Sequence, residues 1–309
     1  MAHPPDTRVL ALSEAAIAEA ARLVLAGQPV AVPTETVYGL AADATNAEAV
    51  ARIYAAKGRP SFNPLIVHVT DLAAAEAIGR FGAEARNLAK AHWPGPLSLV
   101  VPLRQDAGIA LLATAGLTTV ALRVPAHPAI RALLAACERP LAAPSANASG
   151  QISPTRASHV LASLGGRIPL IIDGGATQRG IESTIVAATG SPLRLLRRGP
   201  IEIDARDLEI STAIEAPGQL ASHYAPKKPL RLDACEANDG EYLIGFGEVR
   251  GDVSLSQTGD PVEAAARLFD LLYQADAGPL PRIAVAPIPG DGIAAAIRDR
   301  LKRGAAPRE

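Results

Sequence analysis

Polar and charged side chains follow an apolar run near the N-terminus, where a ligand could be held. Residues 33–40 (PTETVYGL) place hydroxyls, a carboxylate and a phenol directly after the apolar residues 30–32. Polar groups just outside the carboxyl end of a strand occupy the usual ligand position in an α/β sheet. These residue types could orient a small polar molecule, but a turn without function would fit the same letters.

Two cations follow a predicted helix in the sequence KGRPSFNP, residues 57–64. Lys57 and Arg59 would interact favourably with a helix dipole there, which is the structural interpretation. In the functional interpretation, Gly58 and the two prolines fix a loop that directs both cations at phosphate. Arginine suits bidentate phosphate contact, whereas lysine acts as a point charge.

Two ionisable side chains lie inside apolar runs. Arg123 stands within ALRVP, and His68 within LIVHV. A buried arginine is costly without a partner, so Arg123 should meet a carboxylate from the protein or from a ligand. His68 fits a hydrogen-bonded core histidine as well as a ligand-binding one.

A run of small polar residues, PSANASG at 144–150, precedes Ser153. Small residues after a strand let the backbone approach an anion, with hydroxyls and N–H groups as donors. Two more polar segments occupy residues 182–184 and 197–200. Together these stretches favour an anionic ligand.

Several common sites are missing from the sequence. It contains no GxxxxGK[ST] segment, and Gly245, Gly247 and Gly251 miss the dinucleotide fingerprint by one residue and are interpreted as turn residues. No metal-ligand spacing is present, so no protein-held metal is expected. Ser145 has no identifiable catalytic base, and the two cysteines, Cys137 and Cys235, can build neither a disulfide framework nor a four-thiolate zinc site.

Alternating helix and strand patterns must position these residues. Ser13 predicts a helix start, Thr45-Asn46-Ala47-Glu48 fits a capping box for the helix that ends at Lys57, and Pro128 suits the first turn of another helix. Strands are expected at 65–69, 97–101, 119–124 and 170–173, and residues 183–188 and 193–197 predict a hairpin. Crossovers together with a hairpin indicate an α/β fold with a mixed sheet.

The 309 residues suggest about two domains. The pattern changes near residue 200, which predicts a catalytic domain at 1–203, a linker at 204–228 and a small α/β domain at 229–309. The net charge of −1 argues against a protein that coats nucleic acid with its whole surface. Neither a secretory signal nor a membrane-length apolar run is present, so we expect a soluble cytoplasmic protein and no membrane partner.

The ordered set of motifs resembles the Sua5/YrdC/YciO family of threonylcarbamoyl-adenylate synthases. The matching pieces are PTETVYGL, KGRPSFNPLIVHV, WPGPLSLVV, LRVP, APSANASG, GIESTIV and LRRGPI, and APGQLASHYAP is similar to the linker of the longer, Sua5-type members. Arg198 departs from the proline that the family usually has. The resemblance implies a YrdC-like twisted mixed sheet with helices, plus a small C-terminal Rossmann-like α/β domain.

The resemblance also implies the substrates L-threonine, bicarbonate or CO₂, and ATP with Mg²⁺, and a product that feeds tRNA t6A modification. Downstream tRNA threonylcarbamoyl-transfer machinery would be the partner, while contact with tRNA itself is not required. Around L-threonine it implies Thr36, His68, Arg123, Ala143 and Ser183. Around ATP it implies Arg59, Asn63, Thr119, Ser145, Ser153, Arg197 and Tyr224, with Lys57, Arg59 and Arg197 as the catalytic cations and His223 in support.

Three alternatives stay open at the sequence level. An RNA-binding module could use the same basic segments, although the near-zero charge and few aromatics weaken that interpretation. Related domains occur in carbamoyl-transfer proteins of hydrogenase maturation, whose zinc-finger regions this chain lacks the cysteines to form. A scaffold without catalytic function is disfavoured by the polar segments at predicted strand ends.

Overall fold

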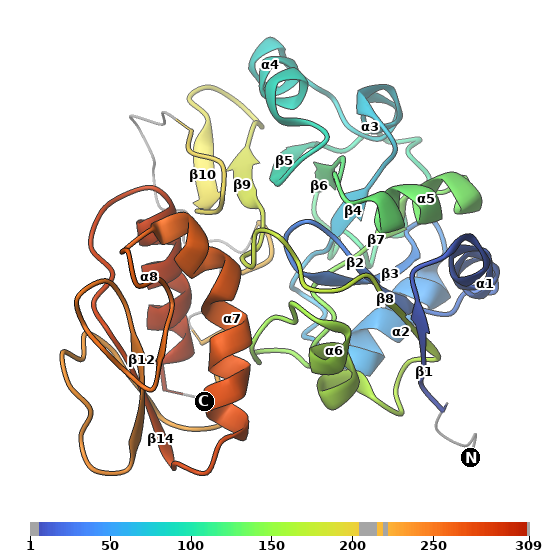
Figure 1. Cartoon of the computed structure of the whole chain (residues 1–309). Coiled ribbons are helices and arrows are strands. Elements are labelled where there is room, and N and C mark those ends of the chain that lie inside the picture. The colour runs from blue at the N-terminus through green and yellow to red at the C-terminus, as the bar shows by residue number, and fades with distance from the viewer. Residues whose placement is uncertain (1–5, 204–214, 219–221, 308–309) are drawn as a thin grey trace.

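The computed structural model describes residues 6–203, 215–218 and 222–307. Two sheets organise these residues, and Figure 1 shows them in separate lobes. In the described part of the chain, no helix is long and apolar enough to cross a membrane. The expected α/β architecture with a large mixed sheet and a small second sheet is confirmed.

The larger sheet has ten strands within the described residues, in the spatial order β1-β8-β2-β3-β7-β4-β6-β5-β9-β10. The sheet contains parallel pairs such as β4 with β6 and antiparallel pairs such as β2 with β3. The strands are β1 (Arg8–Ala11), β2 (Val30–Pro33), β3 (Tyr38–Asp43), β4 (Ile66–His68), β5 (Leu97–Pro102), β6 (Thr119–Arg123), β7 (Leu141–Ala142), β8 (Leu170–Asp173), β9 (Thr184–Ala187) and β10 (Arg194–Arg197).

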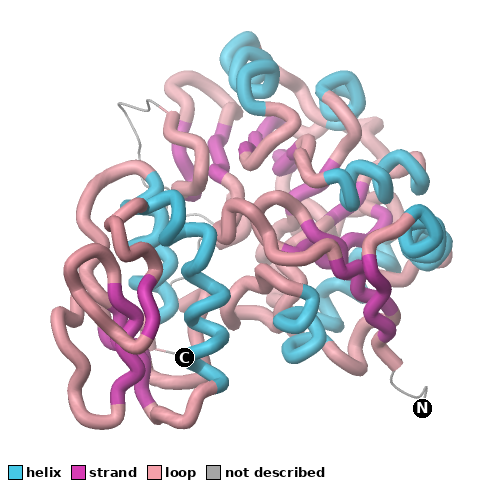
Figure 2. Tube along the Cα trace, in the orientation of Figure 1, coloured by secondary structure: helices cyan, strands magenta, loops and turns pink. Residues whose placement is uncertain are grey.

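Helices cover this sheet, as the ribbon and the tube in Figures 1 and 2 show. They are α1 (Glu14–Leu25), α2 (Ala47–Lys57), α3 (Leu72–Ile78), α4 (Ala83–His92), α5 (Pro128–Cys137) and α6 (Ala157–Leu164). Ser13 accepts a hydrogen bond from the amide of Ala16, which confirms the predicted cap of α1. The cap of α2 was predicted wrongly. The side chain of Asn46, not that of Thr45, accepts hydrogen bonds from the amides of Glu48 and Ala49, while the Thr45 hydroxyl donates to Asp43.

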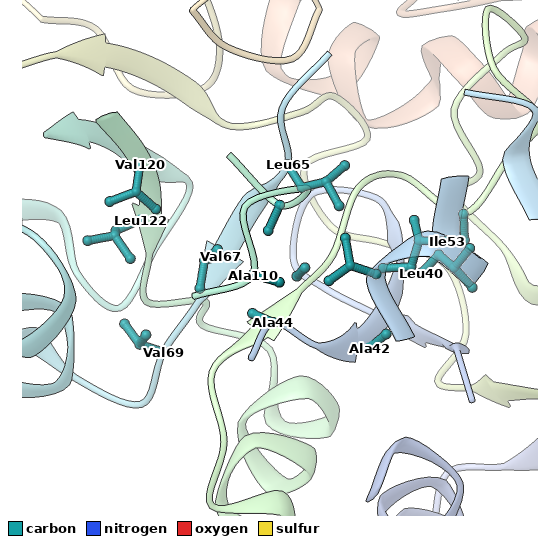
Figure 3. Close-up of a cluster of buried hydrophobic side chains, with 14 of the residues drawn as sticks. Leu40, Ala42, Ala44, Ile53, Leu65, Val67, Val69, Ala110, Val120 and Leu122 are labelled. Atoms are coloured by element: carbon teal, nitrogen blue, oxygen red, sulfur yellow. The ribbon is translucent and has the colours of Figure 1, made fainter. Parts of the chain in front are cut away.

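The core lies on both faces of the sheet because side chains alternate along each strand. Val30 and Val32 pack with residues of α1 and α5 on one face, whereas Ala31 and Leu40 belong to a separate cluster with α2. Figure 3 shows part of that second cluster, in which Leu40 comes from β3, Ile53 from α2 and Val67 from β4. The two layers hold the strand ends, and with them the site, in fixed positions.

The smaller sheet has four strands, all parallel, in the order β11-β14-β12-β13 among the described residues. They are β11 (Leu230–Arg231), β12 (Glu241–Gly245), β13 (Val253–Ser254) and β14 (Arg282–Val285), with α7 (Pro261–Ala277) and α8 (Ile293–Gly304). The apolar cluster of this lobe also includes Val37, Ile152 and Ile181 from the first lobe. The two lobes therefore share a continuous apolar contact.

Candidate active site

One pocket collects residues from most of the polar segments of the first lobe. It lies at the turn between β2 and β3, at the ends of β4, β6 and β7, and beside the segments 217–218 and 223–224. About 470 Å³ between its walls is free of protein atoms, counting the part open to solvent. The lining comprises Thr36, Val37, Arg59, Ile66, His68, Arg123, Ala143, Pro144, Ser145, Glu182, Arg197, Pro217, Gly218, His223 and Tyr224.

The turn between β2 and β3 supplies a carboxylate to Arg123. Oε1 of Glu35 lies 2.5 Å from Nη2 of Arg123, and Oε2 accepts the amide of Ala126 at 3.1 Å. Burial alone would raise the pKa of Glu35, but the charge and hydrogen bond of Arg123 outweigh it, so this pKa is lowered. The carboxylate predicted for Arg123 is thus found in the protein, and the pair fixes the guanidinium at the pocket wall.

Thr36 and His68 stand beside Arg123 in the same wall. Thr36 Oγ1 accepts hydrogen bonds from Nη1 and Nη2 of Arg123, both at 3.1 Å. His68 is the register partner of Arg123 on neighbouring strands, and its Nδ1 has no hydrogen-bond partner among the described residues. Burial, followed by the charge of Arg123, lowers the pKa of His68 to about 3. The imidazole is therefore neutral at pH 7 and could accept or donate a hydrogen bond to a ligand.

Arg59 and Arg197 are buried at the pocket wall without a carboxylate. Among the ion pairs between described residues, none includes either side chain; both bond to neutral oxygens instead. Nη2 of Arg59 lies 2.6 Å from Oδ1 of Asn63, and Nη2 of Arg197 lies 3.0 Å from Oγ of Ser183. Burial lowers the pKa of Arg59 to about 10 and lowers that of Arg197 too. Buried charge of this kind is stabilised by an anion.

Five of the expected site residues lie near the pocket without forming its lining. Asn63 orients Arg59, Ser183 bonds both Arg197 and Ser98 Oγ, and Ser153 donates to Glu182. The remaining two are Thr119 at the start of β6 and Lys57 at the end of α2. Four of these residues contact the lining, whereas no such contact is found for Thr119 among the described residues. A direct contact to ligand stays a prediction for all five.

Lys57 holds the loop at 144–150. Its Nζ donates to the carbonyls of Ser145 at 2.6 Å and Asn147 at 2.5 Å, and its own carbonyl accepts the amide of Ser149. Burial, followed by the charge of Arg59, lowers the pKa of Lys57 well below its usual value. The structure thus places Lys57 behind the pocket wall that Ser145 forms.

His223 and Tyr224 close one side of the pocket. Tyr224 has a positive φ of 62° and is buried, and its hydroxyl has no hydrogen-bond partner among the described residues. Burial raises the pKa of Tyr224, and it lowers that of His223 well below 6.5. A Cβ at Gly218 would lie 2.8 Å from the Tyr224 hydroxyl and 3.0 Å from Arg197 Cδ, so the close approach requires glycine. Because of these pKa shifts, the side chains of His223 and Tyr224 are both neutral at pH 7.

Sequence reasoning missed the acidic part of the site. Glu35 and Glu182 stand in motifs that were singled out, but neither was given a role. Arg300, which pairs with Glu182, was not considered at all. Its signal was its place in the buried stripe of α8, together with Ile297, Leu301 and Gly304, because an arginine in an apolar stripe needs a partner.

The fold and the pocket define a two-lobed α/β protein with buried cations gathered in a pocket of its first lobe. The Sua5/YciO/YrdC family model, described as "Telomere recombination", matches residues 22–199, and the model "Threonylcarbamoyl-AMP synthase, C-terminal domain" matches residues 179–306. Threonylcarbamoyl-AMP synthase of Bacillus subtilis is 39% identical, covering 98% of this chain and 96% of the relative. The chain belongs to the Sua5/YrdC/YciO family, in its two-domain, Sua5-type form.

Other similar proteins agree in length and fold. Threonylcarbamoyl-AMP synthase of Pyrococcus abyssi is 38% identical over 92% of both chains. The solved structure of P. abyssi Sua5 complexed with L-threonine has a TM-score of 0.86 and 35% identity over 97% of both chains. Escherichia coli YciO, with a TM-score of 0.58 and 19% identity, covers 65% of this chain and shares the fold alone.

Proposed function

We propose that this chain is a nucleotidyltransferase that forms threonylcarbamoyl-AMP and pyrophosphate from L-threonine, bicarbonate or CO₂, and ATP. One observation carries the proposal: Arg59 and Arg197 are buried, have no ion-pair partner among the described residues, and share a pocket with Arg123 and the neutral His68. The first pair suits a triphosphate and the second an amino acid. The names of the full-length relatives agree with this activity.

L-Threonine would occupy the wall that Arg123 forms, as the likeness to a threonine-bound relative supports. Glu35 and Thr36 already accept hydrogen bonds from Nη2 of Arg123, and Thr36 also accepts one from Nη1. The threonine carboxylate would therefore bind the remaining N–H group of Nη1. The proposed threonine site consists of Thr36, His68, Arg123, Ala143 and Ser183. The proposed ATP site consists of Arg59, Asn63, Thr119, Ser145, Ser153, Arg197 and Tyr224, with Lys57 holding the loop of Ser145.

The reaction needs no covalent nucleophile from the protein. The threonine amine adds to CO₂ and loses a proton, which gives a carbamate. A carbamate oxygen then attacks the α-phosphorus of ATP, the bond to the bridging oxygen breaks, and pyrophosphate leaves. Arg59 and Arg197 would hold ATP in line and balance charge on the leaving group.

Mg²⁺ would enter with ATP as part of the substrate. Among the described residues, no three His, Cys, Asp or Glu side chains lie together as a metal site. Mg²⁺ bound to phosphate oxygens usually keeps several waters and takes few protein ligands. We therefore propose that the metal binds chiefly through the nucleotide.

We also propose the division into a catalytic domain at 1–203, a linker at 204–228 and a C-terminal domain at 229–309. β10 ends at Arg197 and β11 begins at Leu230, which agrees with these bounds. Residues 204–214 and 219–221 of the linker lie outside the described residues. The remaining part includes His223 and Tyr224, which line the pocket and would shield the labile carbamate from water. The product would pass to the tRNA threonylcarbamoyl-transfer machinery in the cytoplasm.

The test is pyrophosphate release with one component omitted at a time. We expect release only when ATP, bicarbonate and L-threonine are all present, with threonylcarbamoyl-AMP as the second product by mass spectrometry. L-Serine in place of L-threonine measures how far the missing methyl group discriminates, at about 1–3 kcal/mol. Release that does not depend on the amino acid would refute the proposal.

A further inference from the structure

Arg300 is a buried cation that reaches the pocket from the C-terminal lobe. It lies in α8, is 1% exposed, and donates from Nε to Oε2 of Glu182 at 3.1 Å. Its Nη1 lies 2.5 Å from the carbonyl of Arg198. Its guanidinium carbon stands 5.5 Å from the ring centroid of Tyr224, within the range of a cation–π contact.

Both partners of Arg300 line the pocket, although Arg300 itself does not. The second carboxylate oxygen of Glu182 accepts a hydrogen bond from Ser153. The Tyr224 ring also stacks on Phe269 of α7 at 5.7 Å. The side chain of Arg300, from the C-terminal lobe, thus contacts both the pocket wall and the side chain that closes the pocket.

The charge of Glu182 explains why an arginine stands there. Glu182 is the pocket-lining carboxylate, on the same side as Arg197, with which it interacts electrostatically. A carboxylate facing a triphosphate repels it, unless a cation balances its charge. Arg300 supplies that cation from outside the pocket, so Arg197 keeps its charge for the ligand.

We propose that Arg300 is a positioning residue of the active site, which neutralises Glu182 and fixes the Tyr224 ring against the pocket. The C-terminal helix is then part of the ATP site, and the inference rests on the proposed function in assigning a triphosphate there. Arg300 acts through its two neighbours, with no contact to substrate.

Arg300→Met tests the charge, and Lys302→Met, an exposed cation of the same helix, is the matched control. We expect the KM for ATP to rise about 30-fold or more in Arg300→Met, as for loss of one partner of a buried charge pair. The Kd of L-threonine should change less than about twofold, because among the described contacts Arg300 makes none to Thr36, His68 or Arg123. Adding Glu182→Gln to Arg300→Met should recover about tenfold of that loss, a rescue that a structural role alone would not give.

Hydrogen exchange in the ligand-free protein tests the positioning without activity. The amides of His223 and Ala225 donate to the carbonyls of Arg303 and Gly150. Their exchange should become about tenfold faster in Arg300→Met and stay unchanged in Lys302→Met. If Arg300→Met does not fold, Arg300→Lys, which keeps the charge but loses the several donors of the guanidinium, should raise the KM for ATP by less than about tenfold.

The two proposals can fail separately. Absence of threonine-dependent pyrophosphate release from the wild-type protein would overturn the proposed function, while exchange would still decide whether Arg300 holds residues 223–225. An unchanged KM for ATP in Arg300→Met, or no rescue by Glu182→Gln, would overturn the role of Arg300.

Discussion

The strands of each of the two sheets end at a carboxyl edge. Among the described residues, only the edge of the mixed sheet carries those proposed for an anion site. The four-stranded parallel sheet has the architecture whose carboxyl edge commonly binds nucleotides. Its edge is lined by Asp233, Asp291 and Arg298, and Nη1 of Arg298 bonds the carbonyl of Ile288. The mixed sheet instead presents Arg59 and Arg197, which are buried and form no ion pair with another described residue.

At two glycines of the smaller sheet, backbone atoms occupy the space that a side chain would need. A Cβ at Gly251 would lie 2.3 Å from the carbonyl of Leu243, and one at Gly245 would lie 2.4 Å from that of Val249. Gly247 lies in a turn, as predicted, whereas Gly245 ends β12, so the turn interpretation was wrong for Gly245. The comparison teaches that architecture does not assign the ligand; the side chains at the edge do.

Arg197→Ala should have the largest effect, because it removes a preorganised cation from the mixed-sheet pocket. We expect turnover to fall ~100- to 1,000-fold, or about 3–4 kcal/mol. Steady-state pyrophosphate release measures the loss, and circular dichroism checks the fold. Arg22→Ala, at an exposed position of α1, is the control. Turnover of Arg197→Ala near the wild-type value would contradict the assignment of the anion site to the mixed sheet.

The pocket should make the protein sensitive to acid. His68 has a folded pKa of about 3, against 6.5 in the unfolded chain. As pH falls below 6.5 the unfolded chain takes up the proton first, so stability is lost until the folded state protonates near pH 3. The slope is up to about 1.4 kcal/mol per pH unit.

Urea unfolding between pH 7 and 4.5 measures this slope, and His68→Gln should flatten it. Glu35, whose pKa is lowered, adds to the loss below about pH 4.5, in the same direction. Stability that rises as the pH falls from 6.5 to 4.5 would contradict the buried, neutral state of His68.

Lys57→Met should act through the loop at 144–150. The change leaves the carbonyls of Ser145 and Asn147 without their donor, which costs about 1–3 kcal/mol of folding stability. Denaturant melts measure the cost, and the KM for ATP should rise less than in Arg197→Ala. A loss of turnover equal to that of Arg197→Ala with unchanged stability would instead place Lys57 on the phosphates.

Arg298→Ala should have the smallest effect, since it changes the cation at the other edge. We expect the KM for ATP to stay within about twofold, the range of substitutions remote from a site. The same assay measures it. A tenfold increase would show that the parallel sheet takes part in nucleotide binding.

Local signals in the sequence predicted the elements better than the contacts between them. Ser13, Pro128 and the hairpin at 183–197 were confirmed because their signals act within a few residues. β3 was missed since Tyr38–Asp43 is buried on both faces and shows no polar alternation. Asn46 and Thr45 are both good caps, and the choice between them depends on geometry that the pattern does not contain.

The sequence predicted which residue types form the site, but not which residues each of them contacts. The sequence required a carboxylate for Arg123 but could not select Glu35, which lies 88 residues away. Lys57 meets carbonyls 88 and 90 residues along the chain, and Glu182 pairs with Arg300 118 residues away. Contacts of this range are set by the sheet order, which no local pattern encodes.

A crystal structure with a non-hydrolysable ATP analogue and L-threonine tests the central claim most directly. We predict phosphate oxygens at about 2.7–2.9 Å from the guanidinium nitrogens of Arg59 and Arg197, as in charge-assisted hydrogen bonds. The threonine carboxylate should lie at Arg123 in the same pocket. A triphosphate bound at the carboxyl edge of the parallel sheet, beside Asp233 and Asp291, would contradict the account.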